Sequence, residues 1–264
     1  MSGRLEGQVA LITGAGRGQG RSHALALAAE GADVVLCDAA KDIDTVPYPL
    51  ASADDLAETE RLVLATGRRC LSRVVDVRDS AGLEQLVTDA IATFGRIDIC
   101  VANAGTSGGG RFTDLSLAEW RRVMAINLDG AFLTMRDCAR QMVEQGDGGA
   151  IVAISSTSAI HGAPNGAHYG ASKTALLGLV RAMAVGLARH RIRVNSVLPG
   201  WTRTELAEGG YQNDHFREVT TSRTPVRRWA TGDDYRELAA YLCDRDQLWH
   251  TGDEIVADGG YTIF

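Results

Sequence analysis

Seven short apolar runs, separated by longer stretches of helical periodicity, recur along the chain and constrain its fold more than any other feature. Short continuous apolar runs are typical of strands that are buried on both faces of a parallel sheet. The runs are Val9–Ile12, Asp33–Cys37, Cys70–Val75, Ile97–Val101, Ala150–Ile154, Arg193–Leu198 and Glu254–Val256. Parallel strands need crossover connections, which the helical stretches supply. We therefore predict an α/β fold with a doubly wound, seven-stranded parallel sheet and helices on both faces.

The helical stretches show no break that would divide the chain into domains. They are Arg21–Glu30, Ser80–Phe94, Leu117–Glu144, Ala167–Arg189 and Gly232–Cys243. No linker, repeat or low-complexity segment separates them, so we predict one domain over residues 1–264.

Two stretches do not fit the alternation of strands and helices. Residues 39–59 contain IDTVPYPLASADD, whose two prolines break any helix or central strand, and we interpret them as an insertion. Residues 203–224 are polar and irregular and follow the sixth strand. Ligands of open α/β sheets bind at the carboxyl ends of strands, so both stretches can border a ligand, the second as a substrate lid.

Charge and cysteine usage narrow the classes of partner. The net charge of −6, without a Lys/Arg-rich run, gives no reason to expect nucleic acid or an anionic membrane, and favours a small molecule. The first apolar run is too short for a signal peptide or a membrane span. Five scattered cysteines without a CxxC motif indicate reduced thiols and a cytoplasmic protein. No HExxH or Cys/His cluster is present, so we predict no metal site.

A glycine-rich turn, TGAGRGQG, lies between the first strand and the first helix. Gly14, Gly18 and Gly20 would let the backbone approach a pyrophosphate at the N-terminus of that helix, as in a Rossmann fold. Asp38, at the end of the second strand, can accept hydrogen bonds from an adenosine ribose and would repel a 2′-phosphate, which favours NAD over NADP. Arg17 supports the opposite choice, because a guanidinium could bind that phosphate.

Polar residues also follow the third and fourth strands. Asp76 and the run Asn103-Ala104-Gly105 stand at strand ends that suit the adenine and ribose edges of a dinucleotide. On their own they are also ordinary turn residues.

Three residues in ISSTSAIHGAPNGAHYGASK have the spacing of a proton-transfer site. Tyr169 and Lys173 stand at i and i+4 on one face of a helix, so an ammonium can lie beside a phenol and favour its ionised form. A phenol with an ordinary pKa of about 10 is otherwise a poor base at neutral pH. Ser156 precedes Tyr169 by 13 residues, with Ser155 and Ser158 as rivals. A serine hydroxyl there can stabilise charge that develops on a substrate oxygen.

The order and spacing of these motifs resemble the short-chain dehydrogenase/reductase family, over about residues 7–261. The motifs are TGAGRGQG, Asp76-Val77, Asn103-Ala104-Gly105, Asn127, the Ser156/Tyr169/Lys173 spacing, Pro199-Gly200 and Asp258-Gly259-Gly260. The resemblance implies that Tyr169 exchanges a proton with the substrate oxygen and that Ser156 hydrogen-bonds the same oxygen. It implies that Lys173 lowers the pKa of the tyrosine and binds the nicotinamide ribose, while Asn127 supports a water in a proton relay.

The same resemblance implies a set of contacts to NAD. They are Gly14, Arg17, Gly18, Gln19, Gly20, Asp38, Asp76, Val77, Asn103, Ala104, Gly105, Tyr169, Lys173, Pro199, Gly200, Thr202 and Thr204. Family members commonly form tetramers, so the resemblance also implies a homotetramer.

The length of the insertion resembles one subgroup of the family. The segment between Asp38 and Asp76 is longer than the family usually needs for a strand, a helix and a strand. Together with GRGQGRSHALALAAEGADVVLCD, it is similar to the carveol-dehydrogenase-like, mycofactocin-dependent subgroup. That resemblance implies a secondary alcohol such as carveol or another cyclic alcohol and its ketone as substrates, a tightly held NAD, and an external redox carrier. The chain has LPGWTRTEL where that subgroup has a form like HPTGVDTPM, a departure that concerns the substrate more than the cofactor.

Two other functions stay open at this point. One is an NADP-dependent ketone or 3-oxoacyl reductase that uses Arg17, and the other is a non-catalytic nucleotide-binding sensor on the same fold. His161 and His168 are interpreted as surface or supporting residues near the site. Trp201 and Tyr211 can pack on an apolar substrate or anchor their loop to the core.

Overall fold

A computed structural model describes residues 3–43 and 46–264 and contains one seven-stranded sheet. The strands are β1 (Val9–Thr13), β2 (Asp33–Asp38), β3 (Cys70–Val74), β4 (Ile99–Ala102), β5 (Gly149–Ile154), β6 (Ile192–Pro199) and β7 (Glu254–Ala257). All pairs are parallel, in the order β3-β2-β1-β4-β5-β6-β7. The predicted doubly wound sheet is confirmed. The chain reverses its direction of winding between β1 and β4, the position at which such sheets open a ligand crevice.

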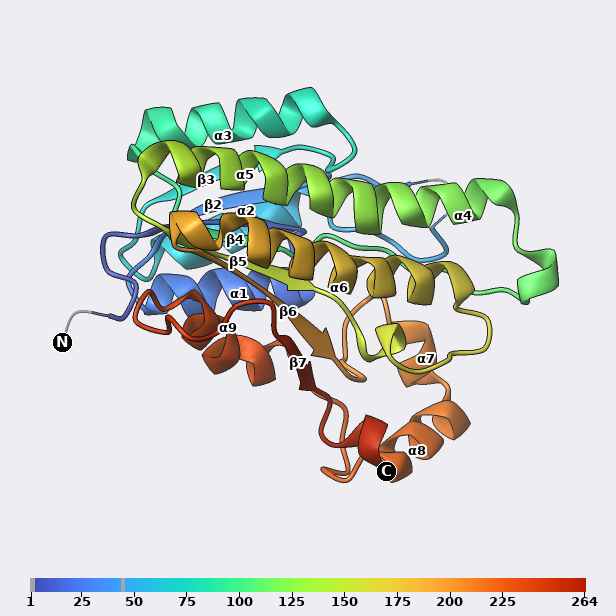
Figure 1. Ribbon diagram of the computed structural model, residues 1–264. Coiled ribbons are helices and arrows are strands. Elements are labelled where there is room, and N and C mark those ends of the chain that lie inside the picture. Colours follow the sequence, from blue (N-terminus) through green and yellow to red (C-terminus); the bar gives the residue numbers. More distant parts are fainter. Residues whose placement is uncertain (1–2, 44–45) are drawn as a thin grey trace.

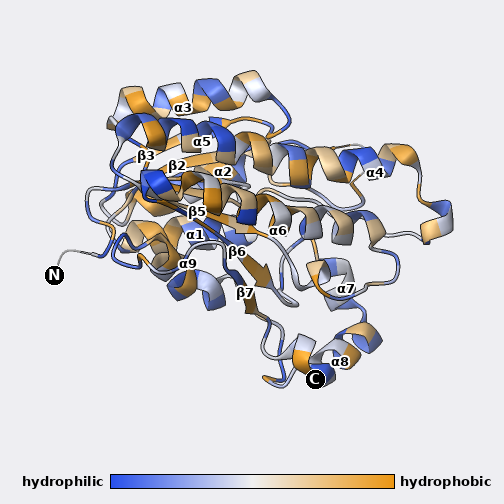
Figure 2. Ribbon diagram, in the orientation of Figure 1, coloured by the Kyte–Doolittle hydropathy of each residue, from blue (hydrophilic) through white to orange (hydrophobic). Residues whose placement is uncertain are grey.

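Helices cover both faces of the sheet (Figure 1). One face carries α3 (Ser80–Phe94), α5 (Ala131–Gln145) and α6 (Ala167–Leu187). The other carries α1 (Gly18–Ala29), α2 (Ala53–Leu64) and α9 (Arg236–Cys243). The short 3-10 turns are Phe112–Asp114, Thr157–Ala159, Ala188–His190, Gly232–Tyr235 and Tyr261–Ile263. Figure 2 shows apolar residues along the strands and mixed polar and apolar residues on the helices, as expected for helices with one wet side.

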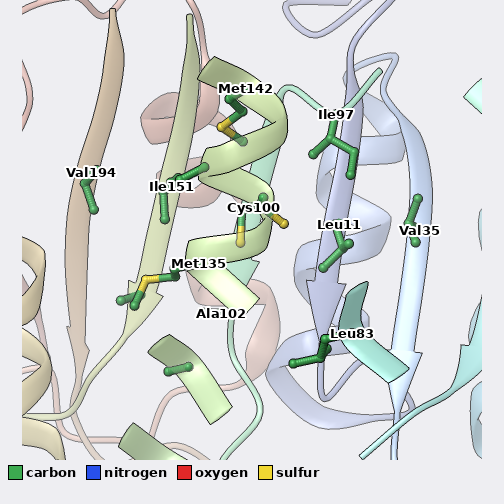
Figure 3. Packing of buried hydrophobic residues seen from close by; sticks show 14 of the residues in the cluster. Leu11, Val35, Leu83, Ile97, Cys100, Ala102, Met135, Met142, Ile151 and Val194 are labelled. Carbon is green, nitrogen blue, oxygen red and sulfur yellow. The ribbon is translucent and has the colours of Figure 1, made fainter. Parts of the chain in front are cut away.

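The larger core cluster fills the face under α3, α5 and α6. Figure 3 shows Met135 and Met142 of α5 packed beside Cys100 and Ile151 of the central strands. All four side chains are fully buried. Burial of this kind stabilises by about 25 cal/mol for each Å² of apolar surface removed from water, and it fixes the strand ends that carry the site.

The predicted helix Leu117–Glu144 is interrupted. The structure has α4 (Leu117–Met124), a π-helical turn (Ala125–Gly130) and then α5. A Cβ on Gly130 would lie 2.5 Å from Cγ2 of Val77, so close packing requires glycine there. The π-turn contains Asn127, and such turns are frequent at functional sites.

The two irregular stretches contain helices that were not predicted. Helix α2 begins inside the insertion, where Ser52 and Asp55 form a reciprocal capping box, a signal that the sequence carried. Asp44 and Thr45 of the predicted insertion lie outside the described residues. The predicted lid contains α7 (Glu208–Gln212) and α8 (Asp214–Arg223), which project beyond the carboxyl ends of β6 and β7 (Figure 1). The stretch predicted as a lid is therefore largely helical, not irregular.

One helical stretch among the described residues, 167–190, is long and apolar enough to cross a membrane. The core helix of a soluble protein passes the same test, and this stretch packs on β6 and buries Ser172 and Lys173.

Candidate active site

A cavity of about 590 Å³ runs along the carboxyl ends of the strands. It reaches from Asp38 at the end of β2 to Trp201 after β6. All predicted site residues line it except Gly20 and Asn127. The volume lies in the range of small-molecule and cofactor sites, which is about 300–1,000 Å³. The structure thus brings the predicted nucleotide turn and the predicted catalytic residues into one cavity.

The glycine turn is shaped by close backbone contacts. A Cβ on Gly20 would lie 2.0 Å from the carbonyl oxygen of Gly14, so the packing of the turn leaves room only for glycine at this position. Gly20 does not line the cavity. Gly14 has a φ of 65°, and a Cβ there would lie 2.8 Å from Cα of Ala104. Helix α1 starts here without a side-chain cap at Arg17 and without an acidic residue in its first turn. Its first N–H groups and dipole therefore favour an anion.

Asp38 and Arg17 have different partners. The Asp38 carboxylate accepts hydrogen bonds from the N–H of Gly16 at 2.9 Å and from the N–H of Ala40 at 3.1 Å. The Arg17 guanidinium hydrogen-bonds the carbonyl oxygen of Pro49, and its Nε lies 3.6 Å from Glu205. The carboxylate thus lies at the glycine turn, while the guanidinium is held by the insertion on one side and by the lid on the other.

Several predicted cofactor contacts use their side chains to build the site. The Asn103 amide donates to the carbonyl oxygens of Thr13 and Gly14, at 3.0 and 3.2 Å, and so joins β4 to the glycine turn. Asp76 pairs with Arg78 at 2.6 Å, and that hydrogen-bonded guanidinium lowers the pKa of the carboxyl. The Thr202 hydroxyl is engaged by the Gly200 carbonyl and the Tyr235 hydroxyl. These side chains line the cavity, but they also determine its shape.

The geometry favours Ser156 over its rivals. The Ser155 hydroxyl donates to the carbonyl oxygen of Lys173 at 2.8 Å, so it is used inside the fold. The Ser156 Oγ accepts the backbone N–H of Ser158 at 3.1 Å, which leaves its own proton available to donate. Burial raises the pKa of Tyr169, and its hydrogen bond with Ser156 opposes that rise.

The expected lowering of the Tyr169 pKa by Lys173 does not appear in this structure. Burial raises the pKa of Tyr169 to about 12, against the opposing effect of Ser156. The Lys173 Nζ lies 5.7 Å from the centre of the phenol ring and donates to the carbonyl oxygen of Ile154 at 2.7 Å. Burial lowers the pKa of Lys173 itself to about 8. Desolvation thus dominates both groups, and the phenol is a proton donor at neutral pH.

Asn127 is fully buried and acts on a neighbouring loop. Its Oδ1 accepts the backbone N–H of Thr106 at 2.8 Å, and its Nδ2 donates to the Thr106 carbonyl at 2.9 Å. Nδ2 also lies 3.1 Å from the hydroxyl of Ser172, which donates to the Tyr169 carbonyl. Asn127 therefore connects the loop after β4 to the helix that carries Tyr169.

Aromatic side chains form one wall of the cavity. Trp201 stacks on Trp229 with ring centres 5.1 Å apart and meets Phe216 edge-on at 5.0 Å. Trp201 and Phe216 line the cavity, so Trp201 both anchors the lid and faces the site. Tyr211 packs against Trp229 and does not line the cavity.

The two histidines differ in position. His161 lines the cavity, whereas His168 is buried and burial lowers its pKa. Neither belongs to a cluster that could hold a metal, and no such cluster occurs among residues 3–43 and 46–264.

The lining residues that were missed from the sequence include three polar ones that contact one another, Tyr48, Thr106 and Ser107. The Tyr48 hydroxyl lies 3.0 Å from Thr106 Oγ1 and accepts the N–H of Ser107 at 3.0 Å. An aromatic residue between two prolines, in a segment already expected to border the site, was the available signal for Tyr48. Thr106 and Ser107 carry no signal of their own beyond their place after a strand end.

The described residues fit a dinucleotide. Added Cβ atoms would fill the cradle at Gly14, and the buried Gln19 Oε1, which lines the cavity, has no hydrogen-bond partner among the described residues. The uncapped N-terminus of α1 suits a pyrophosphate, and Asp38 suits a ribose.

Comparisons with known proteins cover nearly the whole chain. A family model described as enoyl-(acyl carrier protein) reductase matches residues 14–262. The (−)-trans-carveol dehydrogenase of Rhodococcus erythropolis is 38% identical over 98% of this chain and 99% of its own. An uncharacterized NAD-dependent oxidoreductase of Mycobacterium tuberculosis is 46% identical over 78% of this chain and 75% of its own.

A solved structure agrees in fold over the same length. The crystal structure of carveol dehydrogenase from Mycobacterium avium in complex with NAD has a TM-score of 0.96 and 35% identity, and the match covers 99% of this chain and 100% of that one. Sheet order, site geometry and similarity over the full length agree, and the chain belongs to the short-chain dehydrogenase/reductase family.

Proposed function

We propose that this chain is an NAD-dependent oxidoreductase that interconverts a secondary alcohol and its ketone. One observation carries the proposal: the uncapped glycine turn and the Ser156/Tyr169/Lys173 group open into a single cavity. A reacting carbon held near Tyr169 would therefore lie in the same space as a dinucleotide on α1. This arrangement disfavours a non-catalytic sensor, which would not need the complete catalytic group.

Tyr169, Ser156 and Lys173 have separate roles in the proposed reaction. When bound, NAD accepts the hydride that leaves the alcohol carbon. Tyr169 exchanges the hydroxyl proton with the substrate oxygen, and Ser156 donates a hydrogen bond to that oxygen as its charge changes. In the reducing direction the phenol acts as the acid, which suits a pKa raised to about 12 by burial. Lys173 supplies a buried ammonium beside the phenol and a donor for the nicotinamide ribose.

The choice of NAD over NADP rests on two side chains. Asp38 places a carboxylate at the glycine turn, where it would repel a 2′-phosphate. Arg17 is engaged by Pro49 and Glu205, and this counts against its use as a phosphate ligand. The NADP-dependent reductase is therefore the weaker reading.

A cyclic, largely apolar alcohol is the substrate class that the cavity favours. Trp201, Phe216 and Leu206 line it on the lid side, and flat aromatic faces pack well on rings. Two of the three relatives named above are carveol dehydrogenases, so carveol is the first compound to test.

The test is turnover with carveol and cyclohexanol, with NAD or NADP, followed by the absorbance of the reduced cofactor. Tyr169→Phe should lose at least about 100-fold in kcat, because general acid–base catalysis contributes about 10²–10⁴-fold. Binding of NAD should stay near that of the wild type. Retained turnover in Tyr169→Phe would contradict the assignment. A wild type that oxidises neither alcohol, with added cofactor or with an artificial electron acceptor, would contradict the proposed substrate class.

We propose further that the insertion holds NAD tightly and that an external redox carrier reoxidises it. Ala51 lies close to the turn, since a Cβ on Gly16 would come within 2.7 Å of the Ala51 Cβ, and Arg17 ties Pro49 to the same turn. Mass spectrometry of the protein purified without added NAD, before and after dialysis, tests this. Free exchange of NAD would show that the insertion does not hold the cofactor tightly.

Assembly into a homotetramer remains a prediction. β7 is an edge strand, and exposed apolar side chains lie on it, on the loop before it and on α6, at Val256, Leu248, Trp249 and Val185. Such surfaces often lie at subunit contacts. Light scattering on the purified protein measures the mass, and a monomer at micromolar concentration would refute it. The cytoplasmic location also stays a prediction, which fractionation of the native cells would test.

A further inference from the structure

A short segment, residues 46–51, bends at Pro47 and Tyr48 and borders the cavity with Tyr48, Leu50 and Ala51. Side chains at 46, 48 and 50 are half-buried, while the two prolines between them are exposed. Of these three side chains, Tyr48 and Leu50 line the cavity. Two prolines fix φ in this segment and lower the entropy lost on ordering it. The segment is thus built to hold its inward side chains in place.

Tyr48 makes two polar contacts with the loop after β4. The Tyr48 hydroxyl accepts the backbone N–H of Ser107 at 3.0 Å, so its own proton is free for Thr106 Oγ1, also at 3.0 Å. These contacts join positions 58 and 59 residues apart in the chain. Tyr48 also lines the cavity and is near enough to Tyr169 to raise its pKa slightly.

Thr106 connects this contact to the catalytic asparagine. The side chain of Thr106 meets Tyr48, while its backbone N–H and C=O are both held by the Asn127 amide, at 2.8 and 2.9 Å. Thr106 is 1% exposed, so it cannot exchange these partners for water. Any displacement of Thr106 must therefore disturb Asn127.

We propose that Tyr48 is a positioning residue: its hydroxyl fixes Thr106 and thereby sets the orientation of Asn127 toward the catalytic centre. The effect on turnover rests on the proposed function, whereas the effect on the loop does not.

Tyr48→Phe tests the proposal, because it removes one hydroxyl and keeps the ring. Loss of hydrogen bonds of ordinary strength predicts a kcat that is about threefold to tenfold lower, with an unchanged KM for NAD. The matched control is Tyr241→Phe, at a tyrosine that packs against His250 and does not line the cavity. Faster loss of NAD from Tyr48→Phe with an unchanged kcat would make Tyr48 a mere cofactor cover and overturn the proposal.

A double-mutant cycle tests the route through Thr106. In a Thr106→Val background the Tyr48 hydroxyl has lost its side-chain partner, so Tyr48→Phe should lower kcat by a smaller factor than in the wild type. Equal factors in both backgrounds would show that Tyr48 acts independently of Thr106.

Hydrogen exchange gives a readout that does not depend on turnover. In the protein without substrate, the amides of Thr106 and Ser107 should exchange about threefold or more faster in Tyr48→Phe, and Tyr241→Phe should not change them. Unchanged exchange at these amides would overturn the proposal even if the enzyme is active. Faster exchange in a protein with no dehydrogenase activity would instead refute the proposed function and leave the coupling intact.

Discussion

Burial of the charged Lys173 side chain lowers the free energy of unfolding by an amount that stability measurements can detect. The side chain is 3% exposed, and burial lowers its pKa from 10.5 to about 8. A shift of about 2.5 units corresponds to about 3 kcal/mol against the charged form in the folded state. The unfolded chain therefore binds more protons than the folded one between about pH 8 and pH 10.5, and stability rises with pH in that window.

Lys173→Met isolates this effect, because methionine fills similar space without a charge. The free energy of unfolding of the wild type, relative to Lys173→Met, should increase by about 2–3 kcal/mol between about pH 7 and pH 10. Lys173→Met also loses the hydrogen bond to the Ile154 carbonyl, which changes the difference in unfolding free energy by a nearly constant amount below about pH 8. The informative quantity is therefore how steeply that difference changes with pH.

The assay is urea unfolding followed by circular dichroism at several pH values, with both proteins free of cofactor. The other lysine of the chain, Lys41, is exposed, so Lys41→Met is the control, and its difference from the wild type should stay flat. A flat difference for Lys173→Met as well would refute the reasoning that burial holds this ammonium at a cost. Lys173→Met should also lose turnover, because the ammonium beside Tyr169 is then missing.

Two further substitutions test the cofactor half of the cavity. Asp38→Asn removes the charge and keeps an oxygen for the Gly16 N–H, so the ratio of kcat/KM for NAD to that for NADP should fall about tenfold or more, as measured by turnover with both cofactors. An unchanged ratio would mean that Asp38 does not select the cofactor. Gly20→Ala places a Cβ 2.0 Å from the Gly14 carbonyl, so unfolding in urea should show a loss of about 1–3 kcal/mol, and calorimetry should show weaker NAD binding. Wild-type values for both would refute the close packing of the turn.

Much of the site could be predicted because it depends on local spacing. The i, i+4 relation of Tyr169 and Lys173 and the glycine turn at a strand end are properties of nearby residues, and periodicity places the strands. Parallel strands also carry their carboxyl ends to one edge, so residues that follow strands converge without further information.

The sequence did not reveal which polar side chains hydrogen-bond other parts of the chain. Asn103 and Thr202 were expected at the cofactor, and the structure engages their polar atoms with Thr13, Gly14, Gly200 and Tyr235. The π-helical turn that contains Asn127 ends at Gly130, which packs against Val77, a contact between distant segments. Periodicity records neither contact, because it reports only neighbours along the chain.

The sequence by itself determined the seven-stranded parallel sheet, the glycine turn at the end of the first strand, and the choice of Tyr169, Lys173 and Ser156 as the proposed catalytic residues. The tertiary structure decided that Arg17 is held by Pro49 and Glu205, that Tyr48 reaches Thr106, and that desolvation governs the pKa values of Tyr169 and Lys173. The physical reason is that burial and long-range hydrogen bonds depend on which segments meet in space, whereas spacing fixes only what each segment can form locally.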